Sequence, residues 1–226
     1  TITIPDNVID EANLKVSNSP TNGYMLTAQS GNTGGLTWAA ASGGGGASVL
    51  GDLTDVSMDI TNFVDGLLIQ PNSDGSAPTT GTLDTATGNI GIGKSTFAAL
   101  TSADYNTSLG YNSSISITTG GYNTAVGGEA LKANTTGIEN VAIGYNALSS
   151  NNTGAKNIGI GLSALRTNTT GDYNIGIGRS VLYANTTADY NTAVGYTALT
   201  ANTTGASNVA IGNVALKTNT TGSGLV

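Results

Sequence analysis

The sequence contains no cysteine and no histidine. Thiol nucleophiles, disulfides, imidazole bases and the common zinc ligands are therefore excluded, as is a Ser-His-Asp triad within this chain. Charged residues make up only 9% of the 226 residues, against about 25% in an ordinary soluble domain. No run of 18 apolar residues occurs, so we expect no membrane-spanning helix and no membrane insertion. These absences predict a protein that is not an enzyme and holds no cofactor.

Glycine, by contrast, is abundant, with 33 residues, and 38% of the chain is hydrophobic. Low hydrophobicity with high charge is typical of disorder, and this composition is the opposite. The net charge of −7 is unevenly distributed, because residues 1–88 hold nine acids and one base, whereas residues 89–226 hold five acids and six bases. An acidic front region argues against nucleic-acid binding, which needs a basic surface. The asymmetry also predicts two regions with different roles.

The second region is an internal repeat. The motif Asn-x-small-aliphatic-Gly recurs every 17 residues without an insertion or deletion. We number the repeat from position 1, its asparagine, to position 17. Position 1 is Asn89, Asn106, Asn123, Asn140, Asn157, Asn174, Asn191 and Asn208.

Three columns of the repeat predict its structural roles. Position 4 is always a branched aliphatic residue: Ile92, Leu109, Val126, Ile143, Ile160, Ile177, Val194 and Ile211. Position 5 is always glycine: Gly93, Gly110, Gly127, Gly144, Gly161, Gly178, Gly195 and Gly212. Position 9 is mostly leucine, namely Leu131, Leu148, Leu165, Leu182, Leu199 and Leu216, with Phe97 in the first copy. Ser114 interrupts this column, and the adjacent Ile115 is a candidate to replace it.

Each copy is interpreted as one coil of a β-solenoid. The aliphatic run before glycine predicts a short strand, and glycine permits a turn through positive φ or close backbone approach. A short strand around Ala-Leu and a second turn at Asn-Thr-Thr-Gly complete the coil. Stacked coils form parallel sheets with strands about 4.8 Å apart, so eight coils give a rod of roughly 38 Å. The columns at positions 4 and 9 are predicted to form the structural core, and the column at position 5 the turn.

Each coil offers only about three large apolar side chains, at positions 2, 4 and 9, and position 2 is often threonine. This is a thin core for a single chain, and the small residues at position 3 leave room for another backbone. We therefore predict several chains around one shared axis. The expected fold is all-β: a parallel β-roll or β-solenoid of 17-residue coils, built as an intertwined or axially packed homotrimer, with a small β-rich N-terminal region.

Composition divides the chain into four parts. Residues 1–42 alternate short strand-like runs with turn signals, among them Asn22-Gly23 as a candidate hairpin turn. Residues 43–46 are four glycines, a flexible linker. Residues 47–88 are interpreted as a small β-rich collar module, and residues 89–226 as the eight-coil shaft.

The phrases Asn-Val-Ala-Ile-Gly and Asn-Thr-Ala-Val-Gly-Tyr-Thr-Ala-Leu, followed by Asn-Thr-Thr-Gly, carry a resemblance across residues 89–226. The first resembles the β-roll heads of trimeric autotransporter adhesins, and the longer phrase is similar to repeats in bacteriophage tail fibres. Residues 1–42 resemble N-terminal pieces of phage tail proteins. The resemblance implies a trimeric fibre in the virion, outside the cell, whose N-terminal region joins other tail proteins. It also implies a structural or receptor-binding role toward a host surface glycan or protein.

Two sets of side chains are candidates for binding. Asp52, Asp55 and Asp59 offer oxygen ligands for calcium, although their spacing matches no EF-hand and a solvated acidic face explains them more simply. Four tyrosines share position 17 and are candidate glycan contacts, because an exposed ring offers a flat apolar face: Tyr105, Tyr122, Tyr173 and Tyr190. The simpler alternative is that each tyrosine packs on its neighbours along the rod.

The Asn-Thr-Thr rows have three readings: turn and ladder hydrogen bonding, N-glycosylation at sequons such as Asn134, and ice binding by threonine arrays. The sequence thus favours a tail-fibre segment that attaches a virion to its host. A bacterial trimeric surface adhesin is the alternative, and an ice-binding β-solenoid is the third hypothesis.

Overall fold

The computed structural model describes residues 24–28, 36–40, 56–57, 63–64, 67–69 and 85–226. Its contacts divide the chain into two units, Thr1–Val49 and Leu50–Val226. In the first unit, β1 (Tyr24–Ala28) pairs antiparallel with β2 (Leu36–Ala40). The candidate hairpin turn Asn22-Gly23 lies outside the described residues.

The second unit is built from short strands, and the described residues contain no helix, hence none that could span a bilayer. Four strands precede the repeat region: β3 (Val56–Ser57), β4 (Phe63–Val64), β5 (Leu67–Ile69) and β6 (Ala86–Thr87). Each repeat then contributes one strand: β7 (Ile90–Ile92), β8 (Thr107–Leu109), β9 (Thr124–Val126), β10 (Val141–Ile143), β11 (Ile158–Ile160), β12 (Ile175–Ile177), β13 (Thr192–Val194) and β14 (Val209–Ile211).

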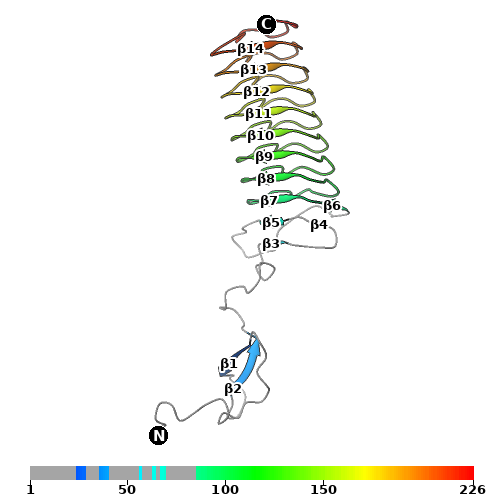
Figure 1. Ribbon diagram of the computed structural model, residues 1–226, viewed down its shortest axis with the longest axis vertical. Helices are drawn as coiled ribbons and strands as arrows, with labels where there is room; N and C mark the ends of the chain where they lie inside the picture. Colours follow the sequence, from blue (N-terminus) through cyan, green and yellow to red (C-terminus); the bar gives the residue numbers. More distant parts are fainter. Residues whose placement is uncertain (1–23, 29–35, 41–55, 58–62, 65–66, 70–84) are drawn as a thin grey trace. The chain divides into compact units, whose positions relative to one another are not determined.

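Strands β7 to β14 stack in sequence order as a parallel sheet (Figure 1). Paired residues in adjacent strands are one repeat apart. Val141 pairs with Ile158 and Ala142 with Gly159, in each case 17 residues further along the chain. The backbone bonds between coils fit this parallel register: the N–H of Val141 donates to the carbonyl of Asn157, the residue before its partner Ile158, at 2.8 Å. The predicted all-β parallel solenoid of 17-residue coils is confirmed.

The segment after each strand consists of two consecutive tight turns. The N–H of Ala147 donates to the carbonyl of Gly144 at 3.2 Å, and the N–H of Asn151 to that of Leu148 at 3.1 Å. Asn146 and Leu148 have φ of 58° and 50°, in the left-handed region that disfavours side chains. The prediction of a short strand around Ala-Leu is therefore wrong. The chain reverses there, because a 17-residue coil has to close within a few residues.

The glycine column confirms the predicted turn. All eight glycines at position 5 have φ between 127° and 143°. A Cβ on Gly144 would lie 2.5 Å from the carbonyl oxygen of Gly161, in the next coil. Both reasons for glycine, positive φ and close backbone approach, hold at this position.

The interior of each coil is narrow, and its large side chains come from the turn segment that follows the strand. The predicted core leucines Leu131, Leu148, Leu165, Leu182 and Leu199 are fully buried, and Leu216 is partly buried against them. Opposite them lie the small residues of position 3, which are also buried. A Cβ on Gly159 would lie 3.2 Å from the Cγ of Leu148, so the strand has little room for a larger side chain there.

The aliphatic column at position 4 is not part of this interior, and the prediction that it forms the core of the coil is wrong for the single chain. Ile92, Leu109, Ile143 and Ile177 are 38% to 46% exposed, and Ile211 is 71% exposed. Val126, Ile160 and Val194 are half-buried. Because side chains alternate along a strand, an inward position 3 directs positions 2 and 4 outward.

The sheet begins before the first repeat. Strand β5 pairs parallel with β7, and the N–H of Leu67 donates to the carbonyl of Asn89 at 2.8 Å, as between repeats. Leu68 is buried on the inner side, and β3 pairs antiparallel with β5 at this end. The sheet is therefore continuous across Asn89, where the 17-residue repeat begins.

In the second repeat, a polar layer crosses the core. Ser114 is buried at the leucine position, so Ile115 does not replace it. Ser108 donates to Ser113 at 2.7 Å in the same layer. These serines lie between the two apolar clusters of the interior.

Candidate interaction surface

The outward face of β7 to β14 exposes a continuous row of apolar side chains. We call positions 2 and 4 of these strands the aliphatic strip. It consists of thirteen aliphatic side chains and three threonines, Thr107, Thr124 and Thr192, and it carries no charge. At about 4.8 Å per strand it is roughly 34 Å long, with its two rows about 7 Å apart. A surface of this size approaches the few hundred Å² at which apolar patches mark interaction sites.

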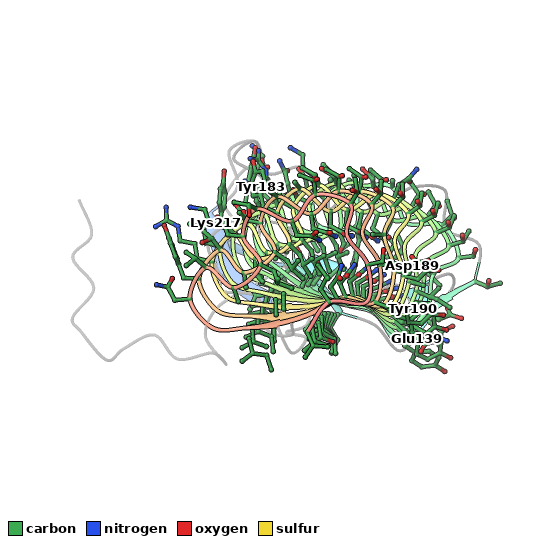
Figure 2. The ribbon with its side chains drawn as sticks, turned by 90° about the horizontal axis from the view of Figure 1, so that it is seen from above. Glu139, Tyr183, Asp189, Tyr190 and Lys217 are labelled. Atoms are coloured by element: carbon green, nitrogen blue, oxygen red, sulfur yellow. The ribbon has the colours of Figure 1, made fainter. Side chains whose placement is uncertain are left out.

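On one side of the aliphatic strip lie positions 16 and 17, which we call the acidic edge. It holds four acids and one base: Asp104, Glu139, Asp172, Asp189 and Lys156. The side chains of these aspartates also accept hydrogen bonds from backbone N–H groups of the preceding coil. For example, the N–H of Asp172 donates to Asp189 Oδ1 at 2.7 Å. Glu139, Asp189 and Tyr190 lie together on one side of the stack (Figure 2).

Lys156 is held within the acidic edge by its neighbour one coil on. Its Nζ donates to the hydroxyl oxygen of Tyr173 at 3.1 Å and lies 5.1 Å from the centroid of that ring. The hydrogen bond to Tyr173, with the negative charge of Glu139, raises the pKa of Lys156 above 10.5. Tyr173 thus orders the one ammonium in this row of acids.

On the other side of the strip lies the turn edge, which we define as positions 6 to 10. It holds five of the six bases of the repeats: Lys94 and Arg179 at position 6, and Lys132, Arg166 and Lys217 at position 10. Its one acid, Glu129, is paired with Lys132 at 3.2 Å. Lys217 lies on a different side of the stack from Glu139 and Asp189 (Figure 2). The uncharged strip is thus flanked by edges of opposite sign.

Aromatic rings fix the two arginines of the turn edge. Arg166 Nη1 donates to the hydroxyl oxygen of Tyr183 at 2.5 Å, and its guanidinium lies 5.6 Å from that ring. Arg179 lies 5.9 Å from the ring of Tyr196. In each pair the ring is one coil beyond the cation, so the stack orders the positive charges along the rod.

The candidate glycan-binding tyrosines are paired with one another. Tyr105 stacks on Tyr122 with ring centroids 5.3 Å apart, and Tyr173 on Tyr190 at 5.0 Å. Gly88 covers the other side of Tyr105, because a Cβ there would lie 2.7 Å from the ring. Lys156 lies over the other face of Tyr173. This is the simpler packing alternative, although Tyr122 and Tyr190 remain 61% and 59% exposed.

The Asn-Thr-Thr rows are occupied by contacts between coils. Asn134 is buried and its Nδ2 donates to the carbonyl of Gly137 at 3.0 Å, which leaves this sequon no exposed amide for a glycan. The first threonine uses its hydroxyl in the stack, as Thr169 Oγ1 donates to the carbonyl of Thr186 at 3.0 Å. The second threonine, at position 14, is the exposed one in most coils. The ladder reading of these rows is confirmed.

A second ladder, at position 1, was not predicted. Asn89, Asn106 and the asparagines that follow are all buried, and each amide bonds the next coil. The sequence feature that indicates this ladder is the asparagine found at position 1 of every repeat. The opposite signs of the two edges could likewise be read from the charged residues once sorted by repeat position.

The calcium candidates Asp52, Asp55 and Asp59 lie outside the described residues, as does the glycine linker at 43–46. Within the described part of the chain, no group of three or more acids comes together as a metal site would require.

No family model matches the chain, and neither a curated protein nor a solved structure is similar to it.

Proposed function

We propose that this chain is a structural segment of an extracellular fibre, a bacteriophage tail fibre, that self-assembles as a homotrimer and serves attachment of the virion to its host. The observation that carries the proposal is the aliphatic strip, which runs without a charge along eight stacked strands. A rod that exposes such a surface over its whole length is suited to lengthwise association with other rods.

Area favours three copies over two. Two strips of roughly 240 Å² each, packed face to face, bury about 480 Å², far less than the roughly 1,200 Å² of a stable specific interface. Three strips turned toward one axis bury about 720 Å², and contacts between the edges of neighbouring copies supply the remaining area. The isoleucines that the single chain leaves exposed then supply the shared core.

Attachment to a host requires a surface that stays outside such a trimer. The threonines of position 14 belong to the part of the coil away from the strand. Tyr122 and Tyr190 belong to the acidic edge, which contacts the neighbouring copy in such a trimer, so the exposed threonine row is the better candidate for contact with a host surface. The N-terminal unit is the proposed joint to other tail proteins.

Two experiments test the proposal. Sedimentation equilibrium of the full chain at micromolar concentration is expected to give three times the chain mass, and a folded monomer contradicts the trimer. Immunogold electron microscopy with antibodies against residues 89–226 is expected to label fibres of phage particles. Label on bacterial surfaces favours the adhesin instead, and thermal hysteresis without either label favours the ice-binding alternative.

A further inference from the structure

We infer that the stack has a built-in breakpoint between the repeats 106–122 and 123–139, where the first two coils open independently of the coils that follow. The inference concerns contacts within one chain, so it stands or falls separately from the proposed trimer. It goes beyond the proposed function, because it divides the shaft into two cooperative units.

The leucine column of the interior is interrupted at this place. Leu131, Leu148 and Leu165 are fully buried at position 9 and belong to one apolar cluster. In the repeat 106–122 the same position is Ser114, which is also buried but has no hydrocarbon beyond its Cβ. The residue one coil before Leu131 is therefore a serine, and the cluster begins only in the repeat 123–139.

Three serines form the inner layer of the second coil, and their hydroxyl groups are only partly satisfied. Ser108 Oγ donates to Ser113 Oγ at 2.7 Å. Ser113 Oγ reaches the carbonyl oxygens of Ala125 and Ala130, in the next coil, only at 3.4 and 3.5 Å. Within the described part of the chain, no group forms a hydrogen bond with the buried Oγ of Ser114. Because a buried hydroxyl without a good partner costs free energy, this layer weakens the packing between the second and third coils.

The amide ladder of position 12 is interrupted at the same place. In the later repeats each amide donates to the asparagine one coil back, as Asn151 Nδ2 does to Asn134 Oδ1 at 3.0 Å. In the first two repeats position 12 is Leu100 and Ile117, both fully buried. Asn134 Nδ2 donates within its own turn, to the carbonyl of Gly137 at 3.0 Å, and Ile117 offers it no side-chain acceptor. The ladder therefore begins at the third coil.

The backbone and the ladder of position 1 continue across the breakpoint. The N–H of Thr107 donates to the carbonyl of Asn123 at 2.8 Å, and Asn123 Nδ2 donates to Asn106 Oδ1 at 3.0 Å. The side-chain interior, by contrast, is divided into two apolar clusters. In a stack where each coil depends on its neighbours, the weakest interface separates units that open independently.

Native-state hydrogen exchange of the full chain tests the breakpoint, with mass spectrometry resolving one strand amide in each coil. The reporters are amides that donate to the next coil: Ile90, Thr107, Thr124, Val141 and Ile158. After correction for intrinsic rates, we expect the first two to share one rate, and the last three to exchange at least about tenfold more slowly. A gradual change along the five amides, as fraying from the end produces, overturns the inference, and so does one common rate.

A variant without the serine layer distinguishes the breakpoint from fraying. Ser108→Ala, Ser113→Ala and Ser114→Leu together give the second coil the alanine, alanine and leucine that the repeats 140–156 and 191–207 carry at these positions. We expect the amide of β8 to exchange at least about threefold more slowly, so that the step between β8 and β9 shrinks. An unchanged step in a variant that circular dichroism shows to be folded overturns the inference.

The reciprocal variant keeps the inference falsifiable if the second coil does not accept the leucine. Ala142→Ser, Ala147→Ser and Leu148→Ser place the serine layer in the fourth coil, and we expect a new step of at least about threefold between β10 and β11. Ala133→Ser is the control, because position 11 carries serine in other repeats, as at Ser150, and it is expected to leave the rates unchanged. No new step in the folded triple variant, or a step in the control, overturns the inference.

Discussion

Asn140 Oδ1 accepts the backbone N–H of Asn157 at 3.0 Å, one coil further along the rod. The Nδ2 of Asn157 donates to the same oxygen at 3.2 Å and to the carbonyl of Gly171 at 2.8 Å. These asparagines are fully buried, and the ladder runs through all eight repeats. The interior thus consists of a leucine column beside amide ladders, and both depend on the neighbouring coil.

Asn157→Ala is expected to lower the free energy of unfolding by roughly 2–4 kcal/mol, because several buried polar groups lose their partner. Among them is the N–H of Asn174, which donates to Asn157 Oδ1 at 2.9 Å. Chemical denaturation followed by circular dichroism measures the change. Asn213→Ala, on the exposed turn, is the control, and an equal effect of the two changes would contradict the role of the ladder.

Comparing Gly144 with Gly212 distinguishes the two reasons for glycine at position 5, positive φ and close approach of the next coil. Both have positive φ, 133° and 129°, but a Cβ on Gly144 would meet the next coil, whereas none lies within 4 Å of Gly212. Gly212→Ala is therefore expected to carry the cost of φ alone, about 1–3 kcal/mol. Gly144→Ala is expected to cost several kcal/mol more, because the stack has to open locally. Similar melting temperatures for the two variants would show that close approach contributes nothing.

Leu148→Ala and Ile143→Ala distinguish the interior of the coil from the aliphatic strip. Leu148 is fully buried and Ile143 is 38% exposed. The leucine change is expected to cost about 2–5 kcal/mol of unfolding free energy through a cavity. The isoleucine change is expected to leave the fold of the dissociated chain nearly unaffected and to weaken association. Reversed effects on unfolding and sedimentation would contradict this assignment.

Lys156 and Tyr173 predict a pH-dependent contact. The pKa of Lys156 is raised above 10.5 in the folded chain, chiefly by the hydrogen bond to Tyr173. A raised lysine pKa stabilises the fold below pH 10.5 and ceases to do so as the pH rises through the folded-state pKa. Tyr173→Phe is expected to lower the pKa of Lys156 in an NMR titration. Tyr190→Phe, which removes a hydroxyl one coil further on, is expected to leave that pKa unchanged, and an equal shift in both variants would exclude the hydrogen bond as its cause.

The sequence was sufficient to predict the register of the stack. A period of 17 without insertions permits one alignment, and the glycine at position 5 and the leucine at position 9 indicated the turn and the core. The alternation at Val141, Ala142 and Ile143 also placed positions 2 and 4 on one face. It did not show which face is inside, because a conventional strand buries its large residues. The inversion arises from Leu148, which enters the interior from the turn and leaves room only for a small residue opposite.

Other features had weaker signals. Leucine with φ near 50°, as at Leu148, is uncommon, so two turns were mistaken for a strand. Summed over residues 89–226, five acids and six bases nearly cancel, so the total charge does not indicate the two edges. Only their positions within each repeat separate Arg179 from Asp189.

The central claim is that the aliphatic strips of parallel, in-register copies meet. It is tested most directly by the distance between spin labels at one strip position. The sequence has no cysteine, so Ile211→Cys, at an exposed site in β14, gives a single nitroxide per chain. Pulsed electron paramagnetic resonance on the assembled full chain is expected to give label separations below about 20 Å, because packed sheets lie ~10 Å apart. A separation beyond about 34 Å, seven strand spacings, would indicate antiparallel copies and contradict the account, as would the absence of any dipolar coupling.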